Sequence, residues 1–419
     1  MHKFYLFFFT FILLVGQLKA EVPTVDAIYS PKIKTVQFYP TGSSTLAPPI
    51  ISLGTTEGLT LEFDELAEDA SFYYFKIIHC NADWSVSNLR SIQFVRDFNE
   101  TFIQNRQFST STKVVFTHYT CNMPTLLVSG NFIVKVYEEG NEDRVILTRR
   151  FNVIENHIGI VGQVKFANNT SKMRTHQMLN FLISYPQYNI VNPSVQLKVI
   201  VRQNFIWKTA TPFLIPLYVR EDIRELDYSY YNDETTFPGG NEYRYFEMRS
   251  FNFSGFNVGR IIKQPDKTEV LLAIDNTRAS KMYILWEDLN GKYSIENYET
   301  GGKRLEADYA TAHFILEAEE LENVDVYVYG ELSNWELAPE NRMKYNPDKK
   351  AYEAELYLKQ GIYNYRYYVK GKTIPVDENY FEGNYSSTEN RYDILVYYRM
   401  PGEFYDRIIG YQTFQFQGK

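Results

Sequence analysis

The sequence predicts an all-β protein: three consecutive immunoglobulin-like β-sandwich domains that follow a signal peptide. Two observations carry this prediction. Apolar and polar residues alternate along many short segments separated by turn residues, which is the pattern of strands with one buried face. Aromatic residues are abundant, with 35 Tyr and 30 Phe in 419 residues, and aromatic side chains favour strands over helices. Frequent turns between short strands are typical of β-sandwiches.

The first twenty residues, MHKFYLFFFTFILLVGQLKA, have the pattern of a secretory signal peptide. A basic start precedes an apolar run from Phe4 to Val15, and the small residue Ala20 marks the expected cleavage site. The apolar run is too short to span a bilayer. We therefore expect residues 1–20 to be removed and the mature chain to be exported without a direct membrane anchor.

The first segment after the signal peptide, residues 21–155, contains clear strand patterns. In GLTLEFDEL, Leu59, Leu61 and Phe63 fall on one face of a strand, and YYFKIIHC forms another apolar-rich run. GNFIVKVYEEGNEDRVILTRRFNV is interpreted as two strands joined by a turn at Gly140-Asn141. We predict that this segment is one sandwich that ends near Glu155–Asn156.

The rest of the chain divides into a second sandwich at 156–302 and a third at 303–419. The dipeptide Asn290-Gly291 is a strong hairpin signal in the second, and AYEAELYLKQGIYNYRYYVKGK supplies two alternating runs in the third. The boundary is placed at Gly301–Gly302, where the alternation breaks. Because all linkers are short, we expect a stiff rod or arc.

The formal charge of the chain is −8 at pH 7, and no basic block interrupts it. An acidic surface has little electrostatic attraction for nucleic acid. The sequence therefore excludes a nucleic-acid partner.

The stretch HCNADW, residues 79–84, gathers residue types that can bind metals or catalyse reactions. His79 and Cys80 are neighbours on a strand, so their side chains point to opposite faces and cannot share a metal ion unless the chain bends. A second pair, His118 and Cys121, invites a zinc interpretation, but the spacings differ from those of zinc fingers. We predict no metal site.

Two interpretations of the cysteines remain open. A Cys80–Cys121 disulfide suits an exported protein, whereas two buried thiols would behave as small apolar residues. In the turn that follows, we expect Asp83 or Asn81 to bond to nearby backbone amides and Trp84 to pack as a core anchor.

Signatures of common enzymes are missing from the sequence. It contains no G-x-S-x-G, H-E-x-x-H, G-x-x-x-x-G-K-[ST] or G-x-G-x-x-G motif. We predict no catalytic residues and no cofactor.

The stretch FPGGNEYRYFEMRS begins with a tight turn and continues as a strand. Glu242 and Arg244 fall on one face and are close enough to pair. An ion pair within the sheet is favoured over a binding role, and VRQNFIW at 201–207 allows the same two interpretations.

Eight stretches stand in order between about residues 28 and 300: IKTVQFYPTG, LEFDEL, HCNADWSVSNL, THY, SGNFIVKVYEEGNED, TRRFNV, VRQNFIW and GGNEYRYFEMRS. Together they resemble the plug proteins of the type IX secretion system of Bacteroidota. The resemblance implies a non-enzymatic protein of the periplasm, associated with the outer-membrane translocon. Its partner would be that β-barrel translocon, whose periplasmic opening it would close when no cargo is being exported.

The resemblance also singles out residues as structural or partner contacts: His79, Cys80, Asp83, Trp84, Gly240, Asn241, Glu242 and Arg244. The family's His-Cys element matches His79-Cys80. Cys121 is not part of the family pattern, which favours a free thiol at Cys80.

The segment from VDVYVYGELSNW to YYVKGK resembles early-set immunoglobulin-like domains, which include glycogen-binding modules. In those modules the tryptophan matched by Trp335 stacks on sugar. The position of a second tryptophan holds Thr373-Ile374 here, so a carbohydrate partner is disfavoured and a core or interdomain role is expected for Trp335. A glycan-binding sandwich protein is the alternative function.

Overall fold

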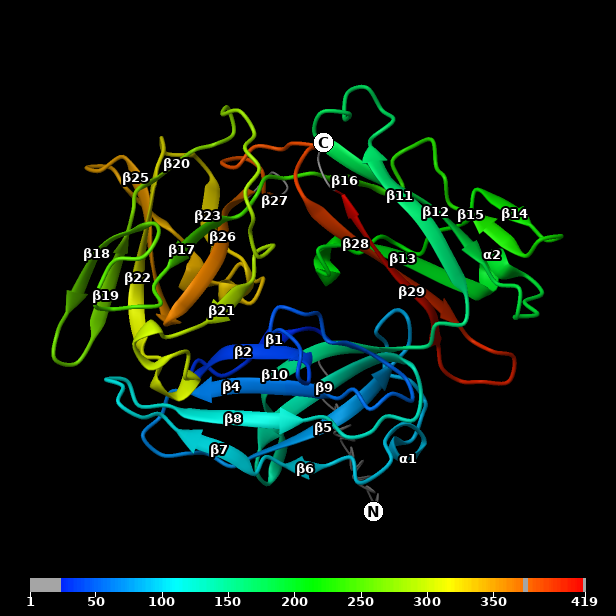
Figure 1. Ribbon diagram of the computed structural model, residues 1–419, viewed down its shortest axis with the longest axis horizontal. Coiled ribbons are helices and arrows are strands. Elements are labelled where there is room, and N and C mark those ends of the chain that lie inside the picture. The colour runs from blue at the N-terminus through cyan, green and yellow to red at the C-terminus, as the bar shows by residue number, and fades with distance from the viewer. Residues whose placement is uncertain (1–23, 372–375, 417–419) are drawn as a thin grey trace, which may run out of the picture.

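The computed structural model describes residues 24–371 and 376–416. The predicted signal peptide, residues 1–20, and Thr373-Ile374 lie outside these residues. Mostly antiparallel sheets stack in pairs, which confirms the predicted all-β sandwich class. Figure 1 shows three such stacks at the corners of a triangle.

The N-terminal sandwich contains the first ten strands. One sheet holds β1 (Ala27–Ile28), β3 (Ile50–Ser52), β5 (Tyr73–Cys80), β6 (Thr101–Phe102), β9 (Gly130–Glu138) and β10 (Asn141–Ile154), and the other holds β2 (Ile33–Pro40), β4 (Leu59–Glu65), β7 (Asn105–Phe108) and β8 (Thr117–Asn122). A short helix, α1 (Ser91–Phe94), follows β5. The predicted turn at Gly140-Asn141 joins β9 to β10. The core lies between the sheets, where Leu61 and Phe63 meet Phe75 and Phe132.

The second sandwich, which we call the split sandwich, draws its strands from two distant parts of the chain. One sheet holds β11 (Gly159–Phe166), β12 (His176–Ser184), β14 (Tyr218–Arg220), β15 (Glu225–Asp227) and β16 (Thr236–Pro238), and the other holds β13 (Leu197–Gln203), β28 (Asn390–Tyr398) and β29 (Arg407–Phe416). The helices α2 (Pro193–Gln196) and η1 (Trp207–Thr209) flank β13. Strand β13 pairs with β28, so that Val199 lies opposite Val396.

The third unit, the inserted sandwich, lies between β16 and β28 in the sequence. One sheet holds β17 (Arg244–Glu247), β21 (Tyr293–Ile295), β23 (Val324–Tyr329), β26 (Gly361–Gly371) and β27 (Val376–Asp377), and the other holds β18 (Val258–Lys263), β19 (Thr268–Leu272), β20 (Asp275–Asn276), β22 (Tyr309–Glu317), β24 (Lys344–Asn346) and β25 (Ala351–Lys359). Its loops contain four 3-10 turns: η2 (Tyr298–Thr300), η3 (Arg304–Glu306), η4 (Glu331–Ser333) and η5 (Pro339–Asn341).

This topology corrects the predicted consecutive division at Gly301–Gly302. Strands on both sides of that dipeptide share one sheet, because β21 and β26 pair. Gly301 and Gly302 only turn the chain between β21 and β22, with positive φ angles of 71° and 89°. The pairing of β13 with β28 joins strands nearly 200 positions apart, and a local alternation pattern carries no record of such a partner.

The predicted hairpin around Asn290-Gly291 forms only in part. The turn is present: both φ angles are positive, at 50° and 81°, and the Lys292 amide donates to the Leu289 carbonyl at 3.2 Å. However, only β21 follows it, and residues 281–289 form no strand. This stretch is held by side-chain contacts instead of strand pairing: the Trp286 indole N–H donates to the Tyr243 carbonyl at 3.0 Å.

The predicted rod or arc is wrong, because the N-terminal sandwich contacts both other sandwiches. On β4 the side chain of Asp64 is buried, and Lys359 of the inserted sandwich donates to it. The opposite sheet, with β5, β9 and β10, packs on β29 of the split sandwich. The N-terminal sandwich therefore touches both of the others.

Candidate functional site

The HCNADW stretch forms the junction between the N-terminal and split sandwiches. Strand β5 ends at Cys80, and the turn behind it rests on the outer face of the β13-β28-β29 sheet. Ala82 packs there with Leu395 and Tyr397. The Ala82 amide donates to the Asp406 carboxylate at 3.0 Å, and the Asn131 side chain accepts from the Tyr397 hydroxyl at 2.9 Å. This stretch therefore holds two sandwiches together.

Trp84 is a buried anchor, as predicted, but it lies at this junction and packs against Trp207 of the split sandwich as well as against its own sandwich. Its ring meets Trp207 edge to face, with centroids 4.7 Å apart. The guanidinium of Arg150 lies 4.2 Å from the Trp84 ring and that of Arg202 lies 4.0 Å from the Trp207 ring. The buried Arg202 is paired with Asp393. Cations stacked on indole rings in this largely buried cluster hold the two sandwiches together.

His79 points to the other side of its sheet and has a structural role. Its Nε2–H donates to the Ser129 carbonyl at 3.3 Å, and its Nδ1 accepts from the Ser87 hydroxyl at 2.9 Å. Burial lowers the pKa of His79 to about 4, although Ser129 and Asp406 oppose this effect. The imidazole is therefore neutral at neutral pH, and both of its nitrogens are already bonded.

Asp83 bonds as predicted to the turn that follows it. Its carboxylate accepts from the Ser85 amide at 3.0 Å and from the Ser85 hydroxyl at 2.6 Å. These two bonds hold the pKa of Asp83 below its usual range, because they outweigh its partial burial. The carboxylate fixes the turn that presents Trp84.

Cys80 and Cys121 are both free and buried, so the disulfide interpretation is wrong. Cys80 packs with Ile78, Trp84 and Ile133 on the outer face of its sheet. Cys121 belongs to the core between the two sheets. Cys80 points to the outer face of the sheet that contains β5, whereas Cys121 lies on the inner side of that sheet. The backbone of the sheet therefore separates the two thiols.

We predict that both thiols are unreactive in the folded protein and react in the unfolded one. Burial raises the pKa of Cys80 to about 12 and that of Cys121 still higher, and only the thiolate is nucleophilic. Titration with a thiol reagent should detect no fast-reacting group in native buffer and both thiols in denaturant without reductant. Failure to recover both thiols in denaturant would contradict the free state.

The second histidine, His118, lies on β8 and bonds to Asp64 on β4, with Nδ1 and Oδ1 2.7 Å apart. It is separated from His79, which lies in the other sheet. Within residues 24–371 and 376–416, no group of three His, Cys, Asp or Glu side chains is arranged to hold a metal ion.

The GGNEYR stretch is the junction between the split and inserted sandwiches. The chain enters the inserted sandwich through residues 239–244 and leaves it through 382–390, and the two crossings are bonded together. The Tyr385 amide donates to the Gly240 carbonyl at 2.8 Å, and the Asn241 amide group donates to the Glu382 carbonyl at 2.7 Å.

Glycine is required at both positions of this crossing. A Cβ on Gly239 would lie 2.0 Å from the Tyr385 carbonyl oxygen. Gly240 has φ +67°, a backbone conformation in which side chains are strained. The two glycines allow the entering and leaving segments to approach within hydrogen-bonding distance.

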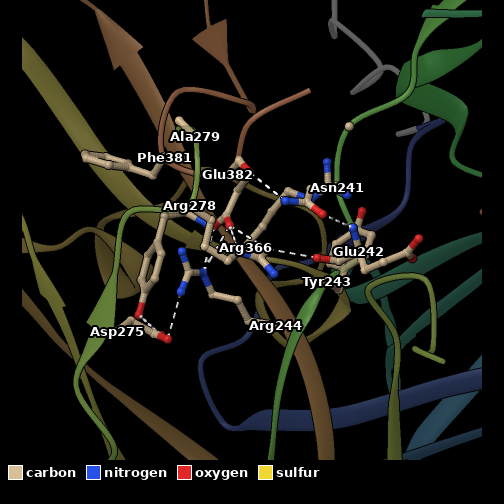
Figure 2. A network of polar contacts seen from close by, with 12 residues as sticks. Asn241, Glu242, Tyr243, Arg244, Asp275, Arg278, Ala279, Arg366, Phe381 and Glu382 are labelled. Atoms are coloured by element: carbon tan, nitrogen blue, oxygen red, sulfur yellow. Dashed lines mark hydrogen bonds and ion pairs between the residues drawn. The ribbon is translucent and has the colours of Figure 1, made fainter. Parts of the chain in front are cut away.

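Arg244 lies at the centre of the network shown in Figure 2. Its Nε donates to Glu382 at 3.0 Å and its Nη1 donates to Asp275 at 2.8 Å. Arg278 bonds to the other oxygen of Glu382 at 2.6 Å. The predicted Glu242–Arg244 pair does not form, because the acidic partners come from segments far along the chain.

Glu242 is buried next to Asp288 rather than beside a cation. Its carboxylate accepts from the Tyr283 hydroxyl at 2.5 Å and from the Glu389 amide at 3.0 Å. Burial raises the pKa of Glu242 to about 7, and the nearby carboxylates of Asp288 and Glu389 add to this effect. Burial also raises the pKa of Asp288.

We predict that Glu242→Gln is more stable than the parent protein at pH 8 but not at pH 4. The native pKa of Glu242 lies above its usual value of 4.5, so the folded state binds this proton more tightly than the unfolded state. In the parent protein, binding of this proton stabilises the folded state. This contribution is complete below pH 4.5, and as the pH rises through 7 the free energy of unfolding falls by up to about 3 kcal/mol. Urea unfolding at both pH values measures the difference.

Glu138→Gln is the matched control for this experiment, because Glu138 is exposed and paired with exposed Arg144 at 3.0 Å. Its change in unfolding free energy should be small and similar at both pH values. An equal effect of the Glu242 and Glu138 variants across this range would refute the prediction.

The third junction joins the N-terminal and inserted sandwiches through a buried ion pair. Lys359 Nζ lies 2.6 Å from Asp64 Oδ2, and both side chains are 1% exposed. The Tyr309 hydroxyl donates to the same oxygen at 2.7 Å. Burial alone would raise the pKa of Asp64, but Lys359 and His118 outweigh it and lower that pKa.

Trp335 has the interdomain position expected for it. Its ring packs against Tyr329 and Tyr243, with centroids 5.6 and 6.4 Å away. Its carbonyl accepts from Lys208 of the split sandwich, and neighbouring Asn334 accepts from Arg149 of the N-terminal sandwich at 2.6 Å. The turn around Trp335 thus contacts all three sandwiches.

Several junction residues were not singled out from the sequence, chiefly Glu382, Asp64, Lys359, Asp393 and Asp406. Each is a charged residue on an alternating strand or in a loop, where a solvated position is the usual expectation. The stretch VRQNFIW was noted in the sequence as a possible ion-pair or binding segment, and its Arg202 and Trp207 do lie at a junction.

Comparison with known proteins identifies the family. The model of the type 9 secretion system plug protein first domain matches residues 33–155, which make up most of the N-terminal sandwich. Residues 33–155 therefore belong to the type IX secretion plug family. The match confirms the predicted recognition.

A solved structure extends the similarity beyond the first domain of this plug family protein. A hypothetical protein from Parabacteroides merdae, known from its crystal structure, is 33% identical, and the match covers 94% of this chain and 100% of that one with a TM-score of 0.89. Trypsin-activated alpha-2-macroglobulin from Escherichia coli is 10% identical over 92% of this chain and 29% of that one, at a TM-score of 0.18 that supports no argument. No curated protein matches the chain.

Proposed function

We propose that this protein is a periplasmic plug that binds the outer-membrane β-barrel translocon of the type IX secretion system. It closes the periplasmic opening when no cargo is being exported and so preserves the permeability barrier. The match of residues 33–155 to the plug family carries this proposal.

The way the sandwiches are joined suits a body that must block a wide opening. A buried ion pair lies at each junction: Arg202–Asp393 within the split sandwich, Arg244–Glu382 within the inserted sandwich, and Lys359–Asp64 across the N-terminal and inserted sandwiches. Breaking a buried pair is costly, because it leaves a charge without water or a partner. A plug built in this way resists deformation.

The surface supports reversible binding rather than chemistry. The formal charge of −8 disfavours self-association of the free form. Apolar side chains are nevertheless exposed at the outer end of the split sandwich, among them Val195, Ile215 and Tyr218 at 71%, 70% and 52%. Exposed apolar groups are typical of interaction surfaces. No helix among the described residues is long and apolar enough to cross a membrane.

Affinity isolation of the full-length protein from native outer membranes tests the proposal. We expect a very large β-barrel protein to co-purify. Deletion of the gene should make cells sensitive to large antibiotics, and this sensitivity should disappear when the translocon gene is deleted as well. Sensitivity that persists without the translocon, or complexes that never contain the barrel, would overturn the proposal.

A further inference from the structure

A cavity of about 220 Å³ lies between the split and inserted sandwiches. The inserted sandwich lines it with Tyr243, Tyr329, Tyr368 and Glu378, and the split sandwich contributes Gln203 and Lys208. The cavity lies beside the GGNEYR junction. No part of the proposed plug function uses it.

The aromatic wall of the cavity is held in place from behind. Tyr329 and Tyr368 have ring centroids 4.3 Å apart, and Trp335 packs against both Tyr329 and Tyr243. Tyr243 and Tyr329 are 4% and 5% exposed. These rings give the cavity a fixed apolar face.

The charged groups around the cavity balance one another. Lys208 lies 3.2 Å from Glu336, and Arg366, which stacks over Tyr243 at 3.8 Å, lies 3.3 Å from Glu378. A phosphate or a free cation would therefore meet no uncompensated charge.

A second observation points to a ligand with hydroxyl groups. Next to the cavity is a smaller one, lined by Gly240, Arg366 and Asn390. Arg366 is 7% exposed, and in the described part of the chain its Nε has no hydrogen-bond partner. The Oδ1 atom of Asn379, which lies 3.6 Å from the place of a Cβ on Gly240, also has none. Buried donors and acceptors are normally paired.

We propose that this cavity binds a single neutral sugar ring. The C–H face of such a ring packs on aromatic side chains, and its hydroxyls both donate and accept hydrogen bonds. The cavity is smaller than the roughly 300–1,000 Å³ of sites for drug-sized ligands, so one ring fits better than a chain. The site is distinct from an exposed tryptophan platform, because here Trp335 only supports the tyrosines.

Saturation-transfer NMR on the mature full-length protein tests the proposal. The probes are the methyl glycosides of glucose, galactose, mannose and N-acetylglucosamine, each at about 10 mM, a concentration that detects millimolar dissociation constants. We expect transfer to at least one of them. Tyr368→Ala, which removes one wall, and Glu378→Ala, which removes a polar group at 32% side-chain exposure, should each weaken binding by about tenfold.

Tyr231→Ala is the matched control, because Tyr231 is 75% exposed and does not line the cavity. It should leave the transfer signal unchanged. Circular dichroism of each variant separates loss of binding from loss of folding. The proposal is overturned if none of the four sugars gives a signal, or if the signal survives in both folded cavity variants.

Discussion

Replacing Glu382 with glutamine is expected to destabilise the protein by roughly 3–5 kcal/mol, because it breaks a buried ion-pair network. Glu382 is 1% exposed and bonds to Arg244 and Arg278. Its backbone-directed oxygen also accepts from the Tyr367 amide at 3.0 Å. The amide of glutamine keeps the shape of the carboxylate but removes the counter-charge of Arg278 and leaves Arg244 with Asp275 alone. Urea unfolding at pH 7 measures the loss.

The contribution of Glu382 to stability should decrease at acidic pH. Burial alone would raise the pKa of Glu382, but Arg244 and Arg278 outweigh it and hold the pKa at about 2. The contribution is therefore complete above the usual pKa of 4.5 and is lost as the pH falls towards 2. The gap between parent and Glu382→Gln should narrow over that range.

Glu225→Gln provides the comparison, because Glu225 forms an ion pair with the half-exposed Arg220 at 2.7 Å. Exposed pairs contribute about 0–1 kcal/mol. If Glu382→Gln costs no more than Glu225→Gln, the network does not hold the junction as described.

The second large effect is expected for Lys359→Met, which removes the cation from the junction of the N-terminal and inserted sandwiches. Asp64 would then stay buried with only His118 and the Tyr309 hydroxyl as partners. We expect a loss of roughly 3–5 kcal/mol in the free energy of unfolding, because an uncompensated charge is left away from water. Denaturant unfolding followed by tryptophan fluorescence measures it.

Two further variants separate the charge from the side-chain volume. Lys349→Met removes a lysine of the same sandwich that is 60% exposed and paired with Glu353 at 2.7 Å, and should cost at most about 1 kcal/mol. Asp64→Asn combined with Lys359→Met removes both buried charges and should recover part of the loss. A double variant as unstable as the single one would show that packing, not charge, decides the effect.

Local sequence patterns predicted the strands of this protein better than their partners. The alternation of GNFIVKVYEEGNEDRVILTRRFNV predicted β9, β10 and their turn, because a hairpin is specified by neighbouring residues. The split sandwich could not be found in this way. The sequences of β13 and β28 are typical of ordinary strands, and neither contains information about which strand it pairs with.

The burial of the charged junction residues could not be predicted from local sequence either. Asp64 and Lys359 stand on alternating strands at positions that would normally face water. They are buried because a second sandwich covers them, and tertiary packing of that kind leaves no local trace. By contrast, Trp84 was predicted to be an anchor from its own chemistry, since a large aromatic ring needs a buried surface wherever it finds one.

The insertion between β16 and β28 also decides when the polypeptide can finish folding. As the chain emerges amino end first, β13 must wait for β28 and β29, which end at residue 416. The inserted sandwich forms a long loop between β16 and β28 whose two ends must meet, and closing a loop of this length slows the pairing of β13 with β28.

A chain truncated after residue 389 should therefore keep a protease-resistant N-terminal sandwich, whereas its split sandwich should be digested. Equal protease resistance of both sandwiches would contradict this folding order. The arrival of β28 and β29 therefore converts an open, protease-sensitive intermediate into the closed triangle.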